Sequence, residues 1–189
     1  MIRETIVTTM NGAGTVHIAP LGIIADGDEW VIAPFRPSTT LDNLRATPFA
    51  VANYTDDVRV FAGCLTGRNQ WPTAASDRVP VPRLAGALAH AELAVRRITE
   101  DAQRPRFHCR VVHLAQHAPF LGFNRAQDAV IEAAILASRL HMLPREKIDS
   151  ELAYLEIAVT KTAGPAEQEA WDWLMEKIRV YRDGADDSS

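Results

Sequence analysis

The first half of the chain alternates short apolar segments with turn-forming residues, a pattern typical of consecutive β-strands. Residues 4–10 are rich in threonine, isoleucine and valine, and the sequence Asn11-Gly12-Ala13-Gly14 follows them as a turn signal. Strands are predicted next over 15–25 and 29–34, separated by Asp26-Gly27-Asp28, whose residues tolerate positive φ angles. The pattern therefore predicts antiparallel strands joined by tight turns.

A proline lies inside the second predicted strand. Pro20 has no N–H to donate to a β ladder. The strand is therefore an edge strand, is bulged at Pro20 or stops pairing there. Each alternative leaves backbone groups where a ligand could reach them.

The middle of the chain is less regular. A short helix is predicted over 38–46, a strand over 48–53, and an acidic-capped turn or helix over 55–63. Residues 67–83 contain three prolines and form a long irregular connection, of a kind that is usually functional or mobile. The segments 87–99 and 106–115 favour strands, although the alanines of the first leave a helix open.

After Pro119 the pattern changes to helical spacing. Residues 124–142 place apolar side chains three and four positions apart, and helices are also predicted over 146–160 and 167–181. Strands followed by helices predict an α+β fold, a small barrel followed by a helical unit. The expected division is a barrel domain over 1–118, a helical subdomain over 119–183 and a disordered tail over 184–189.

Composition narrows the functional classes. The 189 residues are 47% apolar and 23% charged, as in ordinary globular proteins, and the net charge of -4 comes without a basic run. Nucleic acid is therefore not an expected partner. No apolar segment approaches the roughly 20 residues that span a bilayer, and no signal peptide is recognised, so we expect no membrane and a cytoplasmic location. Cys64 and Cys109 form no CxxC motif and are interpreted as packing residues.

The sequence FRPSTTLDNL, residues 35–44, gathers hydrogen-bond donors ahead of the predicted helix. A helix N-cap requires one hydroxyl, which Ser38, Thr39 or Thr40 could supply. The surplus hydroxyls, together with Arg36 and the helix N-terminus, would suit a phosphate monoester. Asp42 would compete with such an anion for the helix dipole, so the capping and anion-binding interpretations both remain open.

Several ordered motifs, spread from about residue 8 to residue 173, resemble a known family. They are HIAPLGI, PFRPSTTLDNL, AVANYTDD, GFNRAQDAVIEAAILASRL and KTAG. In this order they are similar to a family of bacterial and archaeal FMN-binding split-barrel proteins, known as domain of unknown function 447. The resemblance implies a dimeric six-stranded split barrel that binds FMN at the subunit interface, followed by a helical C-terminal unit.

The resemblance also implies roles for individual residues. The phosphate would be held where the third strand leads into the helix, and the flavin ring would lie along the second strand. Asn53 would contact the ring or ribityl chain, and the KTAG motif would complete the phosphate or ring environment. The implied cofactor-binding residues are His17, Ile18, Ala19, Leu21, Arg36, Ser38, Thr39, Thr40, Asn53, Lys161 and Thr162.

Structural explanations compete with some of these roles. Asn53 could belong to a turn capped by an aspartate, and Lys161 could favour a helix C-terminus ahead of Gly164. Asn124 could cap the long helix, and Arg125 could pair with Asp128 on its surface.

The histidines suggest a metal site only at first sight. Cys109, His113 and His117 recur every fourth residue beside His108. On a strand, side chains four residues apart stand about 13 Å from one another, too far for one zinc ion, and only a helix there would bring them together. We therefore predict no metal. His17 is a candidate acid or base, but a structural role is the competing interpretation, and no catalytic residue is assigned.

The chain lacks the motifs of several large enzyme classes. It contains no G-x-S-x-G elbow and no P-loop, and Gly12-Ala13-Gly14 lacks the third glycine of a dinucleotide fingerprint. An enzyme without such motifs would rely on a cofactor for electron transfer. The leading hypothesis is an FMN-dependent, flavin reductase-like oxidoreductase, a cytoplasmic homodimer that uses a small-molecule electron donor or acceptor. The resemblance suggests methanopterin-linked one-carbon metabolism. The alternatives are a non-catalytic flavin-binding or assembly protein and a barrel without flavin.

Overall fold

The computed structural model describes residues 1–186 and divides the chain into two compact units. The barrel unit comprises residues 1–56 and 69–120, and the helical unit comprises residues 57–68 and the chain from 121 onward. The predicted boundary at 118 places residues 57–68 with the barrel, whereas the structure groups them with the C-terminal helices.

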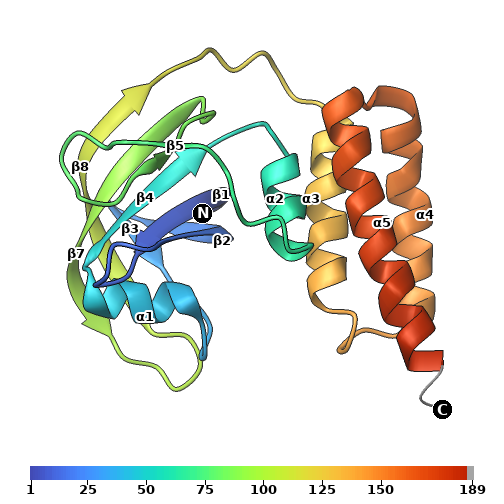
Figure 1. Cartoon of the computed structure of the whole chain (residues 1–189), viewed down its shortest axis with the longest axis horizontal. Coiled ribbons are helices and arrows are strands. Elements are labelled where there is room, and N and C mark those ends of the chain that lie inside the picture. The colour runs from blue at the N-terminus through green and yellow to red at the C-terminus, as the bar shows by residue number, and fades with distance from the viewer. Residues whose placement is uncertain (187–189) are drawn as a thin grey trace. The chain divides into compact units, whose positions relative to one another are not determined.

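The barrel unit is a closed antiparallel barrel of six strands (Figure 1). Around the barrel the strands follow the order β1-β2-β3-β8-β7-β4, and β4 pairs again with β1. The strands are β1 (Ile2–Met10), β2 (Val16–Asp26), β3 (Glu29–Ile32), β4 (Phe49–Tyr54), β7 (Ala89–Thr99) and β8 (Arg106–Gln116). The predicted α+β fold and the strand assignment of 87–99 and 106–115 are confirmed.

Local turn chemistry explains the first hairpin. The side-chain Oδ1 of Asn11 accepts hydrogen bonds from the backbone N–H groups of Ala13 and Thr15, at 3.0 and 2.8 Å. Gly14 and Gly27 have φ angles of 86° and 60°, which other residues rarely adopt, and they lie in the turns that precede β2 and β3. These turns set the antiparallel pairing of β1 with β2 and of β2 with β3.

Pro20 is tolerated because β2 is an edge strand along most of its length. Its pairing with β1 continues through the Ile6–Pro20 pair without a register shift. On the other side, β3 pairs with β2 only from Ile24 to Asp26. The first of the three alternatives for Pro20, an edge strand, is therefore confirmed.

The interior of the barrel is apolar and is covered at one end by helix α1 (Thr39–Ala46). Leu41 and Leu44 of α1 pack into the same buried cluster as Ile23, Leu93 and Phe107. On the helix, Asn43 donates a hydrogen bond to the hydroxyl of Thr9 on β1, at 3.0 Å. The helix is thus fixed to the barrel by apolar burial and by one buried polar contact.

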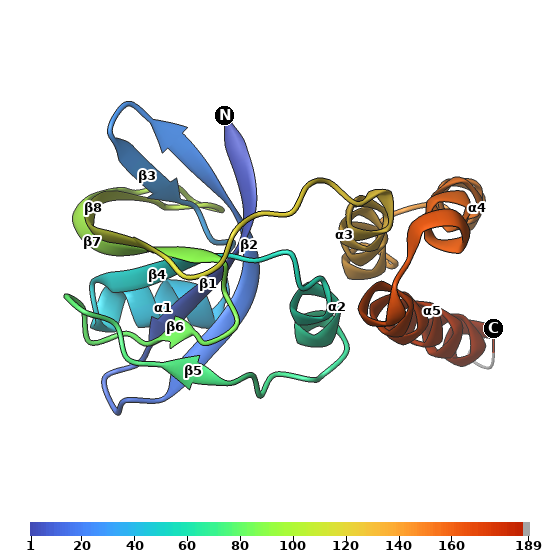
Figure 2. The ribbon, with the colours of Figure 1, turned by 90° about the horizontal axis from the view of Figure 1, so that it is seen from above.

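From residue 69 onward, the irregular connection predicted over 67–83 belongs to the barrel unit. It contributes the short strands β5 (Thr73–Ala74) and β6 (Arg83–Leu84), which pair with each other below β4 in Figure 2. Between them, Val79 and Val81 are buried against Val51 of β4. We refer to residues 75–82, between β5 and β6, as the cover segment.

The helical unit contains four helices. They are α2 (Arg59–Leu65), α3 (Arg125–Ser138), α4 (Arg145–Thr162) and α5 (Pro165–Asp186). The apolar face predicted for 124–142 is buried, and its alanines pack with Trp171, Leu174 and Ile178 of α5. Helix α5 extends to Asp186, so residues 184–186 of the predicted tail are helical, and 187–189 lie outside the described residues. Among the described residues, no helix is both long and apolar enough to cross a bilayer.

Asn124 is the N-cap of α3, as the structural interpretation of this residue predicts. Its Oδ1 accepts from the N–H of Ala126 at 2.8 Å, and its Nδ2 donates to the carbonyl of Thr162 at 3.0 Å. We expect Asn124→Ala to destabilise the helical unit by about 1–2 kcal/mol, because both contacts are lost. Hydrogen exchange of the α3 amides measures this change. Unaltered protection would contradict the capping role, and Ser138→Ala at the other end of α3 is the control.

Candidate functional site

The predicted phosphate position lies at the N-terminus of α1. Ser38 is the N-cap, and its hydroxyl accepts from the N–H of Leu41 at 3.3 Å. One hydroxyl therefore satisfies the cap, as expected, which leaves Thr39 and Thr40 in excess of it. Thr39 is exposed and Thr40 is buried. The capping interpretation is thus confirmed for Ser38 without excluding an anion beside the same helix end.

Arg36 has a carboxylate partner that the sequence did not reveal. Its Nη2 donates to Glu100 at 2.7 Å and its Nε to the carbonyl of Asp101 at 3.3 Å. Arg45, in the last turn of α1, donates to the same Glu100 carboxylate at 2.7 and 2.9 Å. A guanidinium has five N–H donors. Arg36 thus retains donors for a second anion, and Glu100 is shared by two cations.

The turn between β7 and β8 supports the chain segment that leads into α1. Arg104 donates to the carbonyl of Ala33 at 2.9 and 3.1 Å, and its guanidinium lies 4.3 Å from the ring centroid of Phe35. The N–H of Arg36 donates to the carbonyl of Gln103 at 2.9 Å. Residues 33–36 are therefore held from two sides, by β3 and by the 100–104 turn.

The predicted flavin-ring residues lie along the unpaired side of β2. His17, Ala19 and Leu21 are half-buried, and Ile18 is buried. Burial lowers the pKa of His17, which keeps its imidazole neutral at neutral pH. Helix α1 packs against both β1 and β2. The structure thus brings the predicted phosphate and ring segments onto adjacent elements of one unit.

The side chain of Asn53 forms hydrogen bonds within the barrel unit. Its side chain is fully buried, with Nδ2 donating to the carbonyls of Ile6 and Val51 at 2.9 and 3.2 Å. Its Oδ1 accepts from the N–H of Leu84 at 2.7 Å, which fixes strand β6 beside β4. These contacts account for the residue structurally and do not support its predicted contact with the flavin, which stays an untested prediction.

Lys161 and Thr162 lie in the last turn of α4, in the helical unit. The hydroxyl of Thr162 donates to the carbonyl of Ala158 at 2.8 Å and accepts from the N–H of Ala126 at 3.1 Å. Thr162 thus joins the C-terminus of α4 to the N-terminus of α3. Lys161 is exposed and is the basic residue of the last turn, where a cation suits the helix dipole. Their predicted contacts with FMN remain predictions.

A group of buried polar residues lies on the outer face of the barrel, under the cover segment. Glu92 of β7 is fully buried and accepts from three successive N–H groups, those of Asp77, Arg78 and Val79, at 2.7, 2.7 and 2.9 Å. Burial by itself would raise the pKa of Glu92. The three amides and His90 outweigh this effect, so the pKa is lowered and the carboxylate stays ionised.

Cys109 belongs to the apolar interior and not to this polar group. Its thiol is fully buried in the barrel core, and burial raises its pKa to about 12. Burial likewise raises the pKa of Cys64 to about 11. Both thiols therefore stay protonated at neutral pH, in agreement with their interpretation as packing residues.

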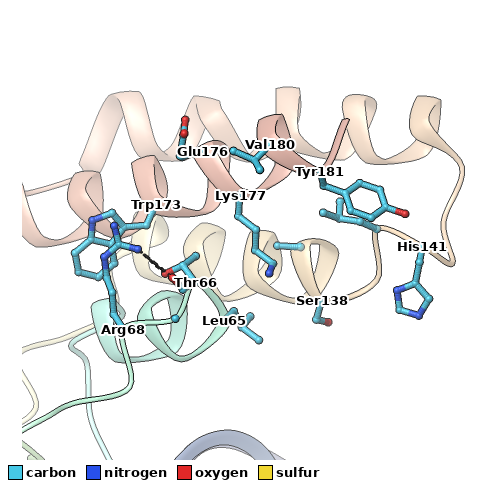
Figure 3. Close-up of a pocket in the computed structure, with 13 residues that line it drawn as sticks. Leu65, Thr66, Arg68, Ser138, His141, Trp173, Glu176, Lys177, Val180 and Tyr181 are labelled. Atoms are coloured by element: carbon cyan, nitrogen blue, oxygen red, sulfur yellow. Dashed lines mark hydrogen bonds between the residues drawn. The ribbon is translucent and has the colours of Figure 1, made fainter. Parts of the chain in front are cut away.

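The helical unit has a cavity of about 780 Å³ between α2, α3 and α5 (Figure 3). Lys177 of α5 points toward α2 and α3, and Arg68 lies 4.4 Å from the ring centroid of Trp173. His141 and Tyr181 lie at the other end of the cavity. None of the predicted cofactor residues lines it.

Models of known protein families match both parts of the chain. A model of the N-terminal domain of the family described as protein of unknown function DUF447 matches residues 3–118, and its C-terminal counterpart matches residues 124–176. The chain belongs to the DUF447 family. The resemblance inferred from the sequence motifs is thereby confirmed. A search of curated proteins found no match.

Solved structures share the fold of this DUF447 chain. An FMN-bound DUF447 protein from Methanosarcina mazei has a TM-score of 0.81 and 22% identity, over 93% of this chain and 94% of that one. Two others match the chain in part. 2-Nitrobenzoate 2-nitroreductase from Pseudomonas fluorescens has a TM-score of 0.52 and 20% identity, over 60% and 64% of the two chains. Flavoredoxin from Methanosarcina acetivorans has a TM-score of 0.54 and 12% identity, over 64% and 72%. The predicted split-barrel fold with C-terminal helices is thereby confirmed.

Proposed function

We propose that the protein binds FMN in the barrel unit and acts as a flavin reductase-like oxidoreductase. The phosphate would lie against the N-terminus of α1, where Thr39, Thr40 and Arg36 supply donors and Ser38 completes the cap. The charge of the phosphate suits this position, because the helix end carries partial positive charge and the guanidinium adds a full one.

The flavin ring would lie along the unpaired side of β2. His17, Ile18, Ala19 and Leu21 would offer backbone groups to its polar edge, and Pro20 leaves one N–H position vacant in the strand. In the proposed homodimer a second copy would cover the other side of the ring. When bound, the flavin would supply the two-electron chemistry, while the protein positions the ring and keeps water from it.

One observation carries this proposal. The unpaired side of β2 and the N-terminus of α1 belong to neighbouring elements of a barrel whose fold is shared with an FMN-bound member of the same family. The neighbours named as a nitroreductase and a flavoredoxin support redox function as the class. A link to methanopterin-type one-carbon metabolism rests on the family resemblance alone.

The second candidate is a non-catalytic flavin-binding or assembly protein. Among the four residues of β2 proposed to lie along the ring, only His17 has a side chain that can act as an acid or base. Its burial-lowered pKa leaves a neutral imidazole, which can act as a hydrogen-bond partner as readily as a base. Reactivity toward electron donors distinguishes the two candidates.

We expect the purified protein to take up FMN, to show the visible absorption of a bound flavin, and to lose that absorption when mixed anaerobically with NADH or NADPH. Rapid bleaching supports the reductase, since a hydride leaves the nicotinamide and reduces the flavin. A bound flavin that neither nicotinamide reduces favours the non-catalytic alternative. If the protein is colourless after incubation with FMN and removal of the unbound flavin, both the reductase and the non-catalytic flavin-binding candidate are refuted.

A further inference from the structure

Two histidines and two carboxylates converge on the outer face of the barrel. His90 and Glu92 lie two residues apart on β7 and therefore share a face, and His113 of β8 is the direct cross-strand neighbour of Glu92. Asp77 reaches the same point from the cover segment. One possible ligand atom from each of the four residues lies within 4.8 Å of the others.

The contact distances within this group are long for hydrogen bonds between charged partners. His90 Nε2 lies 3.3 Å from Glu92 Oε1, and His113 Nε2 lies 3.3 Å from Asp77 Oδ2. Charge-assisted N–H···O contacts are usually about 2.7–2.9 Å. Two ligands that share a tetrahedral zinc ion, with bonds of about 2.0–2.1 Å, stand about 3.3–3.4 Å apart. Both pairs therefore have the spacing of ligands on one ion.

The carboxylate of Glu92 has one position left for such an ion. An ionised carboxylate has about four lone-pair sites. Oε2 accepts from the N–H groups of Arg78 and Val79, whereas Oε1 accepts from the N–H of Asp77 alone among the amides. The remaining site is on Oε1, the oxygen that faces His90.

His90 also has the outer partner that metal-binding histidines generally use. Its Nδ1 lies 2.8 Å from Nε2 of His117, and the two rings are nearly parallel, 5° apart. A histidine that donates its Nδ1–H in this way presents an unprotonated Nε2 to a metal.

We propose that His90, Glu92, His113 and Asp77 form a binding site for a divalent transition-metal cation of the Zn²⁺ class. Two imidazoles and two carboxylates suit such a cation better than Mg²⁺ or Ca²⁺, which favour oxygen ligands alone. The site is accessible, because the side chains of Asp77 and His113 are 65% and 31% exposed, while His90 and Glu92 are fully buried. The ion would fasten the cover segment to β7 and β8.

The competing arrangement needs no ion. If His117 Nε2–H donates to His90 Nδ1, then His90 Nε2–H can donate to Glu92 and complete a chain of hydrogen bonds. In that case the partly exposed contact between His113 and Asp77 would stand by itself, and the group would not bind Zn²⁺. Metal binding by the intact protein decides between these arrangements.

The test loads tag-free, full-length protein with ZnCl₂, removes excess zinc by desalting, and measures the retained metal by mass spectrometry. We expect one zinc per chain in the unmodified protein and in His141→Ala, which removes a histidine of the helical unit. We expect His113→Ala and Asp77→Asn to lose the ion. No retained zinc in the unmodified protein, or equal retention by all variants, would overturn the proposal.

A second measurement guards against variants that fail to fold. Circular dichroism checks the fold, and limited trypsin digestion follows cleavage after Arg78, an exposed residue of the cover segment. We expect Zn²⁺ to slow this cleavage in the unmodified protein and not in folded His113→Ala. X-ray absorption of the loaded protein should show nitrogen and oxygen ligands only, and a sulfur ligand would contradict the assignment.

Discussion

Replacing Arg36 and Thr39 together with alanine will weaken FMN binding about 100-fold and change riboflavin binding by less than about threefold. The two ligands differ only in the phosphate, which is the group that these side chains are proposed to hold. Hydrogen bonds to charged groups contribute about 1.5–3 kcal/mol each, and a tenfold change in affinity corresponds to about 1.4 kcal/mol. Fluorescence titration of the protein with each flavin measures both affinities.

Arg45→Ala is the matched control for this experiment. Arg45 pairs with the same Glu100 carboxylate as Arg36 but lies at the opposite end of α1. Its loss disturbs the shared ion pair without removing a donor from the proposed phosphate position, so FMN affinity should stay nearly unchanged. The exposed pairs themselves contribute little to stability, about 0–1 kcal/mol. Equal weakening of FMN and riboflavin by the double variant would refute the placement of the phosphate.

The elements that sequence reasoning predicted are those fixed by neighbours in the chain. The hairpin turn depends on Asn11 and the residues two and four positions after it, and the start of α1 depends on Ser38 and the N–H three positions later. The apolar face of α3 consists of buried residues that recur every three or four positions along the helix. Such patterns can be read from a single sequence because the contacts that they report are local.

The features that sequence reasoning missed depend on contacts between distant residues. Glu100 follows Arg36 by 64 positions, and nothing in its own surroundings marks it as a partner. The grouping of α2 with the C-terminal helices is equally non-local, because Val58 and Ala62 are buried by side chains beyond residue 120. The motif position of Asn53 predicts a flavin contact but does not reveal that this side chain is fully buried.

The group formed by Asp77, His90, Glu92 and His113 also depends on contacts between residues that are distant in the sequence. Along β8 and the residue that follows it, Cys109, His113 and His117 are too far apart to share an ion. The structure brings His113 to Glu92 through the pairing of β7 with β8, at a position followed by a register shift. Finding this group requires the register between β7 and β8 and the path of the cover segment. Neither can be inferred from composition or from residue spacing along one strand.

Glu92→Gln will destabilise the barrel unit by about 3 kcal/mol. The substitution keeps the shape of the side chain but replaces one oxygen by an NH₂ group. Either orientation of the amide places that group against a backbone N–H of the cover segment, which then has no acceptor. Hydrogen exchange of the β4 and β7 amides across a urea series, with EDTA present, measures the barrel unit alone. Glu4→Gln, at an exposed position of β1, should change stability by less than about 0.5 kcal/mol.

The same carboxylate predicts how the barrel responds to acid. The pKa of Glu92 in the folded protein lies below its ordinary value of 4.5, so the folded state binds fewer protons than the unfolded chain. The contribution of Glu92 to stability is therefore complete above pH 4.5 and declines as the pH falls below it. We expect the stability difference between the unmodified protein and Glu92→Gln to be constant from pH 6 to pH 8 and to narrow below about pH 4.5. A difference that persists undiminished in acid would mean that the ionised carboxylate is not what holds the cover segment.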